Sequence, residues 1–134
     1  MLVISKSWAE IESGAMVQSF RDLQVWQRSI QLSVSIYRMT KGFSREEIYG
    51  LTSQVRRSAV SVASNIAEGN GRMSSGEYRQ FLGIARGSNF ELQTQIEIAR
   101  ALGFRDSKML EEAEGLSFEA GKMISGVLNA IKAK

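Results

Sequence analysis

The stretch that decides the fold is residues 46–72, EEIYGLTSQVRRSAVSVASNIAEGNGR. Its apolar side chains recur at steps of three and four residues, which places them on one side of an α-helix. They are Ile48, Leu51, Val55, Ala59, Val62 and Ile66. Between them lie small side chains that let another helix approach closely, namely Ser53, Ser58, Ser61, Ala63 and Ser64. The pattern therefore predicts a helix that packs against other helices.

Two adjacent arginines, Arg56 and Arg57, stand in the middle of this stretch. On a helix, the residues three and four positions away are the neighbours that can neutralise a charge. None of these neighbours is acidic; they are Thr52, Ser53, Gln54, Ala59, Val60 and Ser61. We therefore expect both guanidinium groups to find partners outside their own helix or to remain solvated.

The composition fits one globular domain and argues against an enzyme. The chain has 134 residues, of which 43% are hydrophobic and 23% are charged, so it is large enough to build a single core. It contains no cysteine and no histidine, which excludes thiolate chemistry, imidazole general bases and the commonest metal ligands. Carboxylates alone would need two acids converging on a pocket, and no such pattern is visible. The sequence predicts no catalytic activity, no cofactor, no metal and no small-molecule substrate.

The sequence also predicts a cytoplasmic protein. No apolar run approaches the ~20 residues that a membrane-spanning helix needs. The N-terminal stretch MLVISKSWAEIESG lacks the uninterrupted apolar segment of a signal peptide. The net charge of +3 gives only a weak general attraction to polyanions, so the placement of the charges matters more than their sum.

Helical periodicity continues through most of the chain, and proline is absent. Besides the helix already described, we expect helices over 22–40, over 74–102 and from 106 onward. Loops this short make consecutive helices antiparallel. The expected fold is all-α, an antiparallel up-down-up-down four-helix bundle over residues 20–134. An N-terminal extension over residues 1–19 precedes it, in which Ser7 and Glu10 have the spacing to cap a short helix.

Local signals mark the ends of the expected helices. Asp22 is a plausible cap for the first helix. The capping-box spacing, a serine followed three residues later by a glutamate, occurs at Ser44–Glu47 and at Ser74–Glu77 and predicts that the second and third helices begin there. The turn at Gly69–Gly71 is expected to require a positive φ, and Gly103 is expected to end the third helix in a left-handed conformation.

The first helix carries more apolar surface than one bundle buries. One stripe consists of Leu23, Trp26, Ile30, Val34 and Tyr37, and a second consists of Val25, Leu32, Ile36 and Met39. Soluble monomers rarely expose large apolar patches, so we expect the chain to form a homo-oligomer. For Trp26 and Tyr37, a place in a core is expected rather than base stacking.

Three stretches of the chain resemble a known family. They are FRDLQVWQRSIQLSVSIYRMT, YGLTSQVRRSAVSVASNIAEGNGR and SSGEYRQFLGIARGSNFELQTQIEIARALG, which together run from Phe20 to Gly103. In these stretches the chain is similar to the four-helix bundle proteins associated with 23S ribosomal RNA intervening sequences. It departs from them at Ser44 and Ala63, where members tend to carry proline, and the second change predicts a straighter helix.

The resemblance implies a small cytosolic four-helix bundle whose biochemical role is poorly defined. A related branch serves as the accessory protein of diversity-generating retroelements, where it forms a basic pentamer that binds nucleic acid and a reverse transcriptase. On this basis we expect a homopentamer. RNA, DNA or a partner protein is the expected further partner, and no membrane contact is expected.

Three more arginines extend the candidate nucleic-acid-binding surface: Arg72, Arg79 and Arg86. The helical neighbours of Arg79 and Arg86 include no acid. In antiparallel helices, Arg86 is expected at about the axial level of Arg56 and Arg57, which would give one basic strip. The alternative is that the arginines pair with acids across helices or between subunits, the candidates being Glu68, Glu91 and Glu97.

Gly83 and Gly87 lie one turn apart inside the third expected helix, where each costs about 1 kcal/mol relative to alanine. Close packing of another helix explains their presence. They are therefore candidates for the oligomer interface, together with Ser61, Arg56 and Arg57.

The sequence thus predicts a non-catalytic, homo-oligomeric bundle that acts as an RNA-associated or nucleic-acid-binding scaffold. The alternative is a protein-interaction module, such as a reverse-transcriptase accessory subunit, in which the arginines contact acidic groups of a protein.

Overall fold

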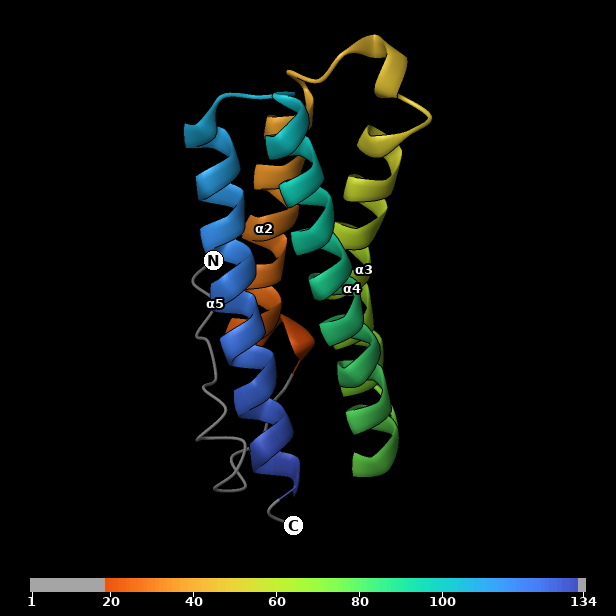
Figure 1. Ribbon diagram of the computed structural model, residues 1–134. Coiled ribbons are helices and arrows are strands. Elements are labelled where there is room, and N and C mark those ends of the chain that lie inside the picture. Colours follow the sequence, from red (N-terminus) through yellow and green to blue (C-terminus); the bar gives the residue numbers. More distant parts are fainter. Residues whose placement is uncertain (1–18, 133–134) are drawn as a thin grey trace.

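Four long α-helices and two short 3-10 turns make up the structure, a computed structural model that describes residues 19–132. The helices are α2 (Gln24–Thr40), α3 (Leu51–Asn70), α4 (Ser75–Leu102) and α5 (Ser107–Lys132), and the turns are η1 (Phe20–Asp22) and η2 (Arg45–Glu47). Successive helices run in opposite directions, as expected for an up-down-up-down bundle (Figure 1). The short helix predicted around Ser7 and Glu10 lies outside the described residues.

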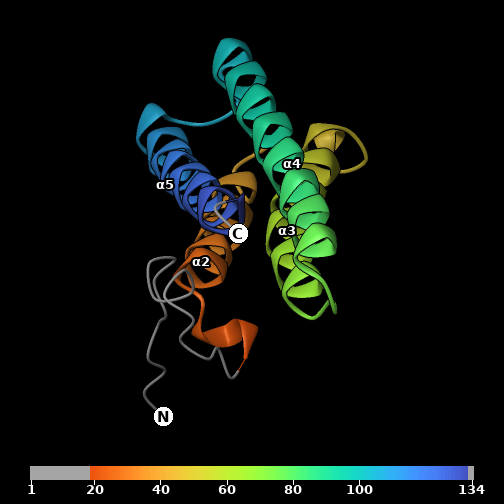
Figure 2. The same cartoon turned by 90° about the horizontal axis from the view of Figure 1, so that it is seen from below.

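Each helix packs against two others. α2 contacts α3 and α5, and α4 also contacts α3 and α5, so the order around the bundle is α2, α3, α4, α5. The end-on view in Figure 2 shows this arrangement. One consequence matters for the surface: the groove between α2 and α3 and the groove between α4 and α5 lie on opposite sides of the molecule.

The core has two apolar clusters. The cluster near the connection between α2 and α3 includes Leu32, Ile36, Met39, Val55, Leu92 and Ile96. The cluster near the other end includes Leu23, Val62, Ile66, Leu82, Ile124 and Val127. On α4, the buried Asn89 lies between them and donates its side-chain amide to the carbonyl oxygen of Ser117 at 2.9 Å. Since the Ser117 hydroxyl donates back to the Asn89 side chain at 2.7 Å, both buried polar groups are satisfied.

One of the two apolar stripes of α2 is buried throughout, whereas the other reaches the core only at its first two residues, Leu23 and Trp26. Val25, Leu32, Ile36 and Met39 are buried, whereas Ile30, Val34 and Tyr37 are 38%, 44% and 42% exposed. The expected core position of Tyr37 is therefore wrong. Its ring lies at the surface, at the edge of the groove between α2 and α3, where the guanidinium of Arg56 lies over it. Trp26 is half-buried and packs edge-to-face on Phe20, with 5.1 Å between ring centres.

Several predicted helix ends are confirmed. Ser74 caps α4, since its hydroxyl oxygen accepts the backbone N–H of Glu77 at 3.2 Å. Gly103 ends α4 with a φ of 68°, in the left-handed region. Asp106 caps α5 by accepting the backbone N–H of Met109 at 3.1 Å.

The first helix begins near the expected position but without the expected cap, and the expected start of the second helix is wrong. Asp22 belongs to η1, and α2 begins after Leu23 without a side-chain cap. Ser44 caps η2 rather than an α-helix, and α3 begins at Leu51, where the carboxylate of Glu47 accepts the Leu51 N–H at 3.1 Å. The physical reason is Gly50, whose non-helical backbone (φ −111°, ψ −118°) interrupts the run.

The positive φ expected in the turn at Gly69–Gly71 is also wrong. Gly71 follows α3 with a φ of −82°, and among the described residues only Gly103 has a positive φ. Gly69 has a different role, because a Cβ atom there would lie 2.6 Å from the Cβ of Phe81. Glycine at this position therefore permits the close approach of α3 and α4.

Candidate nucleic-acid interface

A hollow of about 660 Å³ lies where α2 ends and α3 begins. Its walls come from both helices and from the segment that connects them; the lining residues are Tyr37, Thr40, Lys41, Phe43, Ser44, Arg45, Ile48, Thr52, Ser53, Arg56, Arg57 and Val60. Four of them, Lys41, Arg45, Arg56 and Arg57, are cationic, and no lining residue carries a carboxylate. We refer to this feature as the basic hollow.

The guanidinium group of Arg56 is held in a fixed orientation. Its Nε donates to the Thr40 hydroxyl oxygen at 2.8 Å, and its Cζ lies 4.5 Å from the centre of the Tyr37 ring. The Thr40 hydroxyl is itself anchored, because it donates to the carbonyl oxygen of Ile36 at 2.8 Å. The terminal nitrogens of Arg56 have no partner among the described residues. A guanidinium held by one nitrogen and one ring face presents its remaining N–H groups for an external anion.

The other three cations of the basic hollow have exposed side chains. Within residues 19–132, the side chains of Lys41, Arg45 and Arg57 form no ion pair or hydrogen bond. The acids nearest to these cations in the sequence are Glu46 and Glu47. The segment 41–57 therefore has four positive and two negative charges. The positive charge is therefore neutralised only in part by this segment.

The three acids that the sequence offered as partners for Arg56 and Arg57 contact other residues in the structure. Glu91 accepts a hydrogen bond from the Ser58 hydroxyl at 2.7 Å, Glu97 pairs with Arg100, and Glu68 pairs with Arg72. Within one chain, the structure brings none of them to the two arginines. Ion pairing between subunits stays a prediction.

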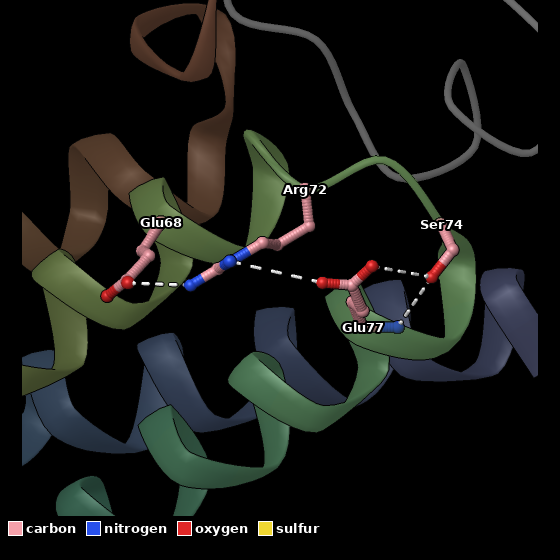
Figure 3. A network of polar contacts seen from close by, with 4 residues as sticks. All are labelled: Glu68, Arg72, Ser74 and Glu77. Atoms are coloured by element: carbon pink, nitrogen blue, oxygen red, sulfur yellow. Dashed lines mark hydrogen bonds and ion pairs between the residues drawn. The ribbon is translucent and has the colours of Figure 1, made fainter.

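Arg72 is neutralised inside the chain. Its guanidinium lies 3.0 Å from the carboxylate of Glu68 and 4.0 Å from that of Glu77, which closes the turn between α3 and α4 (Figure 3). It also lies over the ring of Phe81, with 4.6 Å from Cζ to the ring centre. An external phosphate would have to compete with two carboxylates here.

The structure does not bring Arg79 and Arg86 to the basic hollow. Arg79 donates to the carbonyl oxygen of Leu128 on α5 at 3.3 Å. Arg86 lies 5.4 Å from the ring centre of Phe90 and lines a second hollow of about 660 Å³ between α4 and α5, on the opposite side of the bundle.

The register of α3 against α4 explains this separation. The hydroxyls of Ser61 and Ser88 are hydrogen-bonded at 2.8 Å, and Ser58 bonds Glu91. Arg86 therefore lies nearer the turn than Ser61 does, whereas Arg56 lies farther from it than Ser58 does. The expectation that Arg86 shares the axial level of Arg56 is wrong, by about two helical turns.

The candidate interface residues fall into two groups. Ser61 bonds Ser88 between α3 and α4 of the same chain, so intrachain packing accounts for it. Gly83 and Gly87 are exposed, and a Cβ atom at either position would meet nothing within 4 Å. Among residues 19–132 no helix packs against them, and the prediction that another subunit does so stays open.

Sequence reasoning missed three residues of the basic hollow, Lys41, Arg45 and Thr52. Lys41 and Arg45 lie in the connection between α2 and α3, where helical spacing carries no information. Over residues 19–132, no group of three or more acidic side chains is placed to hold a metal ion, and none of the helices is both long and apolar enough to span a bilayer.

The all-α bundle and the motif-bearing segments are those of a known family. The family model for the 23S rRNA-intervening sequence protein matches residues 21–126. The chain belongs to this family. Its fold is also similar to the crystal structure of a protein of unknown function from the S23 ribosomal protein family of Bacteroides thetaiotaomicron, with a TM-score of 0.72 and 21% sequence identity. That similarity covers 78% of this chain and 97% of the other and supports the fold alone. No curated protein matches the chain.

Proposed function

We propose that this member of the 23S rRNA-intervening sequence protein family is a non-catalytic, homo-oligomeric scaffold of the cytoplasm that binds RNA through the basic hollow. The observation that carries this proposal is the set of four cations, Lys41, Arg45, Arg56 and Arg57, in a concavity that no carboxylate lines. Contacts between cations and phosphates supply most of the sequence-independent affinity for nucleic acids.

The state of the arginines supports the basic hollow over the other basic positions. Binding a phosphate at Arg72 means weakening its contacts with Glu68 and Glu77. At Arg56, an incoming phosphate displaces no acid, and the orientation of the guanidinium is already fixed by Thr40 and Tyr37. Less side-chain entropy is then lost on binding, which favours affinity.

Assembly follows from the exposed apolar side chains. Ile30 and Val34 are exposed on α2, and Phe90 and Phe118 are exposed on the α4/α5 side. Because α2 lies across the bundle from α4, one subunit can place its α4/α5 side on the exposed stripe of α2 of the next and leave the basic hollow open. Such a head-to-tail contact closes into a ring when its rotation permits, and the family resemblance implies a homopentamer. A ring repeats the basic hollow, which raises the avidity for one long RNA.

The test combines sizing with binding. Light scattering after gel filtration is expected to give a mass close to that of a pentamer. Fluorescence anisotropy with a structured RNA is expected to show micromolar affinity at about 50 mM salt and a steep loss by about 200 mM. A stable monomer would overturn the assembly, and no binding at low salt would overturn the RNA function. The second result would favour the protein-interaction module, in which the same cations meet acidic groups of a partner such as a reverse transcriptase.

A further inference from the structure

One buried hydroxyl in the basic hollow has no partner. Thr52 is only 6% exposed, and its Oγ1 makes no hydrogen bond with any of the described residues. Thr52 nevertheless lines the hollow. Buried polar groups are nearly always hydrogen-bonded, because an unmade bond costs stability. The exception at Thr52 therefore points to an external group that supplies the missing acceptor.

Further hydrogen-bond donors line the basic hollow beside Thr52. Arg56 lies one helical turn further along α3, on the same side of the helix, and lines the same hollow. With its Nε occupied by Thr40, it offers its terminal N–H groups. Thr52 and Ser53 also belong to the first turn of the 20-residue helix α3. In this turn, the carboxylate of Glu47 accepts the backbone N–H of Leu51. The backbone N–H groups of Thr52 and Ser53 have no partner among the described residues. Such a set of donors suits a tetrahedral oxyanion.

The size of the basic hollow restricts the ligand further. A volume of about 660 Å³ is far more than one phosphate fills and lies in the usual range of sites for organic ligands. The apolar side chains of Ile48 and Val60 line it as well, and both are partly exposed. The cationic side of the hollow suits a phosphoryl group, and the apolar side suits an organic group that is attached to the phosphoryl.

We propose that the basic hollow is a nucleotide seat, in which the Thr52 hydroxyl and the Arg56 guanidinium hold the phosphoryl group of one nucleotide. The attached nucleoside lies against Val60, which follows Arg56 by one helical turn on the same side of α3. This inference rests on the proposed function, since it assigns the contact within the same site where RNA binds. The nucleotide is either the 5′-terminal residue of an RNA, an internal residue, or a free nucleotide, and all three present the same phosphoryl chemistry.

The test uses the full chain with three probes: AMP, a short RNA with a 5′-phosphate and the same RNA with a 5′-hydroxyl. Thr52→Val keeps the shape of the side chain and removes the hydroxyl. Its matched control is Thr94→Val, which removes a hydroxyl from the exposed surface of α4, where it donates to the carbonyl oxygen of Phe90. Isothermal titration calorimetry measures AMP binding, and fluorescence anisotropy measures the RNAs.

If the hollow is a nucleotide seat, Thr52→Val is expected to weaken AMP binding by about tenfold, whereas Thr94→Val is expected to change it by less than about twofold. Without ligand, Thr52→Val is expected to melt at or above the wild-type temperature, because it removes an unsatisfied buried hydroxyl. A preference for the 5′-phosphorylated RNA that is lost in Thr52→Val identifies a terminal nucleotide as the ligand. Equal, Thr52-dependent affinity for both RNAs identifies an internal one, and Thr52-dependent binding of AMP alone identifies a free nucleotide.

The inference and the proposed function fail in different ways. If wild type and Thr52→Val bind both RNAs equally, with the same salt dependence, the nucleotide seat is overturned and RNA binding by the hollow stands. If AMP binds in a Thr52-dependent manner while neither RNA binds at low salt, the seat stands and the RNA function is overturned. If wild type binds no AMP and no RNA, both are overturned.

Discussion

Arginines lie near both ends of α3, beside the connections to α2 and to α4, but only one end neutralises them. At the C-terminal end, Arg72 lies between the carboxylates of Glu68 and Glu77. At the N-terminal end, Arg56 meets a threonine hydroxyl and an aromatic ring, and Arg57 has no partner among the described residues. We refer to these as the closed end and the open end.

The comparison shows that arginines near the connections have different roles at the two ends of α3. At the closed end Glu68 stands four residues before Arg72, and Glu77 in the first turn of α4 is a second acid, so the charge helps to close the turn. At the open end the suitably placed acid, Glu47, caps α3 by accepting the N–H of Leu51. The cations there remain available to an external anion.

The packing of the two ends differs as well. At the closed end Gly69 is buried, and α4 approaches it so closely that a side chain has no space. At the open end the helices are joined by the 41–50 segment, and the basic hollow lies between them. The bundle is thus tight where its charges are paired and hollow where they are not.

The largest expected effect comes from filling the closed end. Gly69→Ala places a Cβ atom 2.6 Å from the Cβ of Phe81, so the helices must separate. We expect the free energy of unfolding to fall by about 2 kcal/mol, although alanine is the better helix former. Gly115→Ala, inside α5, is the matched control, because nothing lies within 4 Å of the added atom. Urea denaturation measures both variants, and a Gly69→Ala protein as stable as wild type would contradict the tight closed end.

The next largest expected effect is on RNA binding, and it distinguishes the arginines of the open end from Arg72 at the closed end. Replacing Arg56 and Arg57 together by glutamine is expected to weaken RNA binding by about tenfold at low salt and to lower the salt slope by about two, because two phosphate contacts are lost. Arg72→Gln is expected to change the affinity by less than about twofold. Anisotropy titrations across a salt series measure both variants. Equal losses of RNA affinity in the two variants would contradict the distinction between a paired arginine and an arginine that is available to RNA.

A pH titration sharpens the description of the closed end. Burial raises the pKa of the Tyr78 phenol, and the side chain of Asn70 offsets part of this rise. The folded protein therefore holds the phenolic proton more tightly than the unfolded chain does. This contribution to stability is fully present below the ordinary tyrosine pKa of about 10 and is lost as the pH rises through the folded-state value. We expect the melting temperature of wild type to fall more steeply above about pH 10 than that of Tyr78→Phe. Parallel slopes would show that the phenol is not buried.

The smallest effect concerns the ion pairs of Arg72. All three partners are substantially exposed, and such pairs contribute little to stability. Arg72→Gln is expected to lower the free energy of unfolding by less than about 0.5 kcal/mol. Thermal denaturation at low and high salt checks this, and the difference between wild type and variant is expected to shrink as salt screens the pairs. A loss comparable to that of Gly69→Ala would mean that charge, and not packing, holds the closed end.

The amino-acid sequence by itself determined the features that depend on neighbours within one helical turn. The spacing of apolar residues and the absence of proline predicted the four helices, the serine–glutamate pair at residues 74 and 77 predicted the start of α4, and Gly103 predicted its end. The missing acids around Arg56 and Arg57 predicted that these arginines have no partner on their own helix. Each of these is a local property, because helical hydrogen bonds and caps connect residues three or four positions apart.

Only the tertiary structure decided which surfaces are buried and which cations share a site. Periodicity alone does not show which stripe of α2 enters the core, since both stripes are apolar and the choice depends on where α3 and α5 pack. Arg56 meets Thr40 from 16 positions away in the chain, and Lys41 and Arg45 join them from a connection without helical spacing. The unpartnered hydroxyl of Thr52 emerges only when the surrounding helices are in place. Long-range packing sets these relations, because the distance between two helices is decided by the side chains of both.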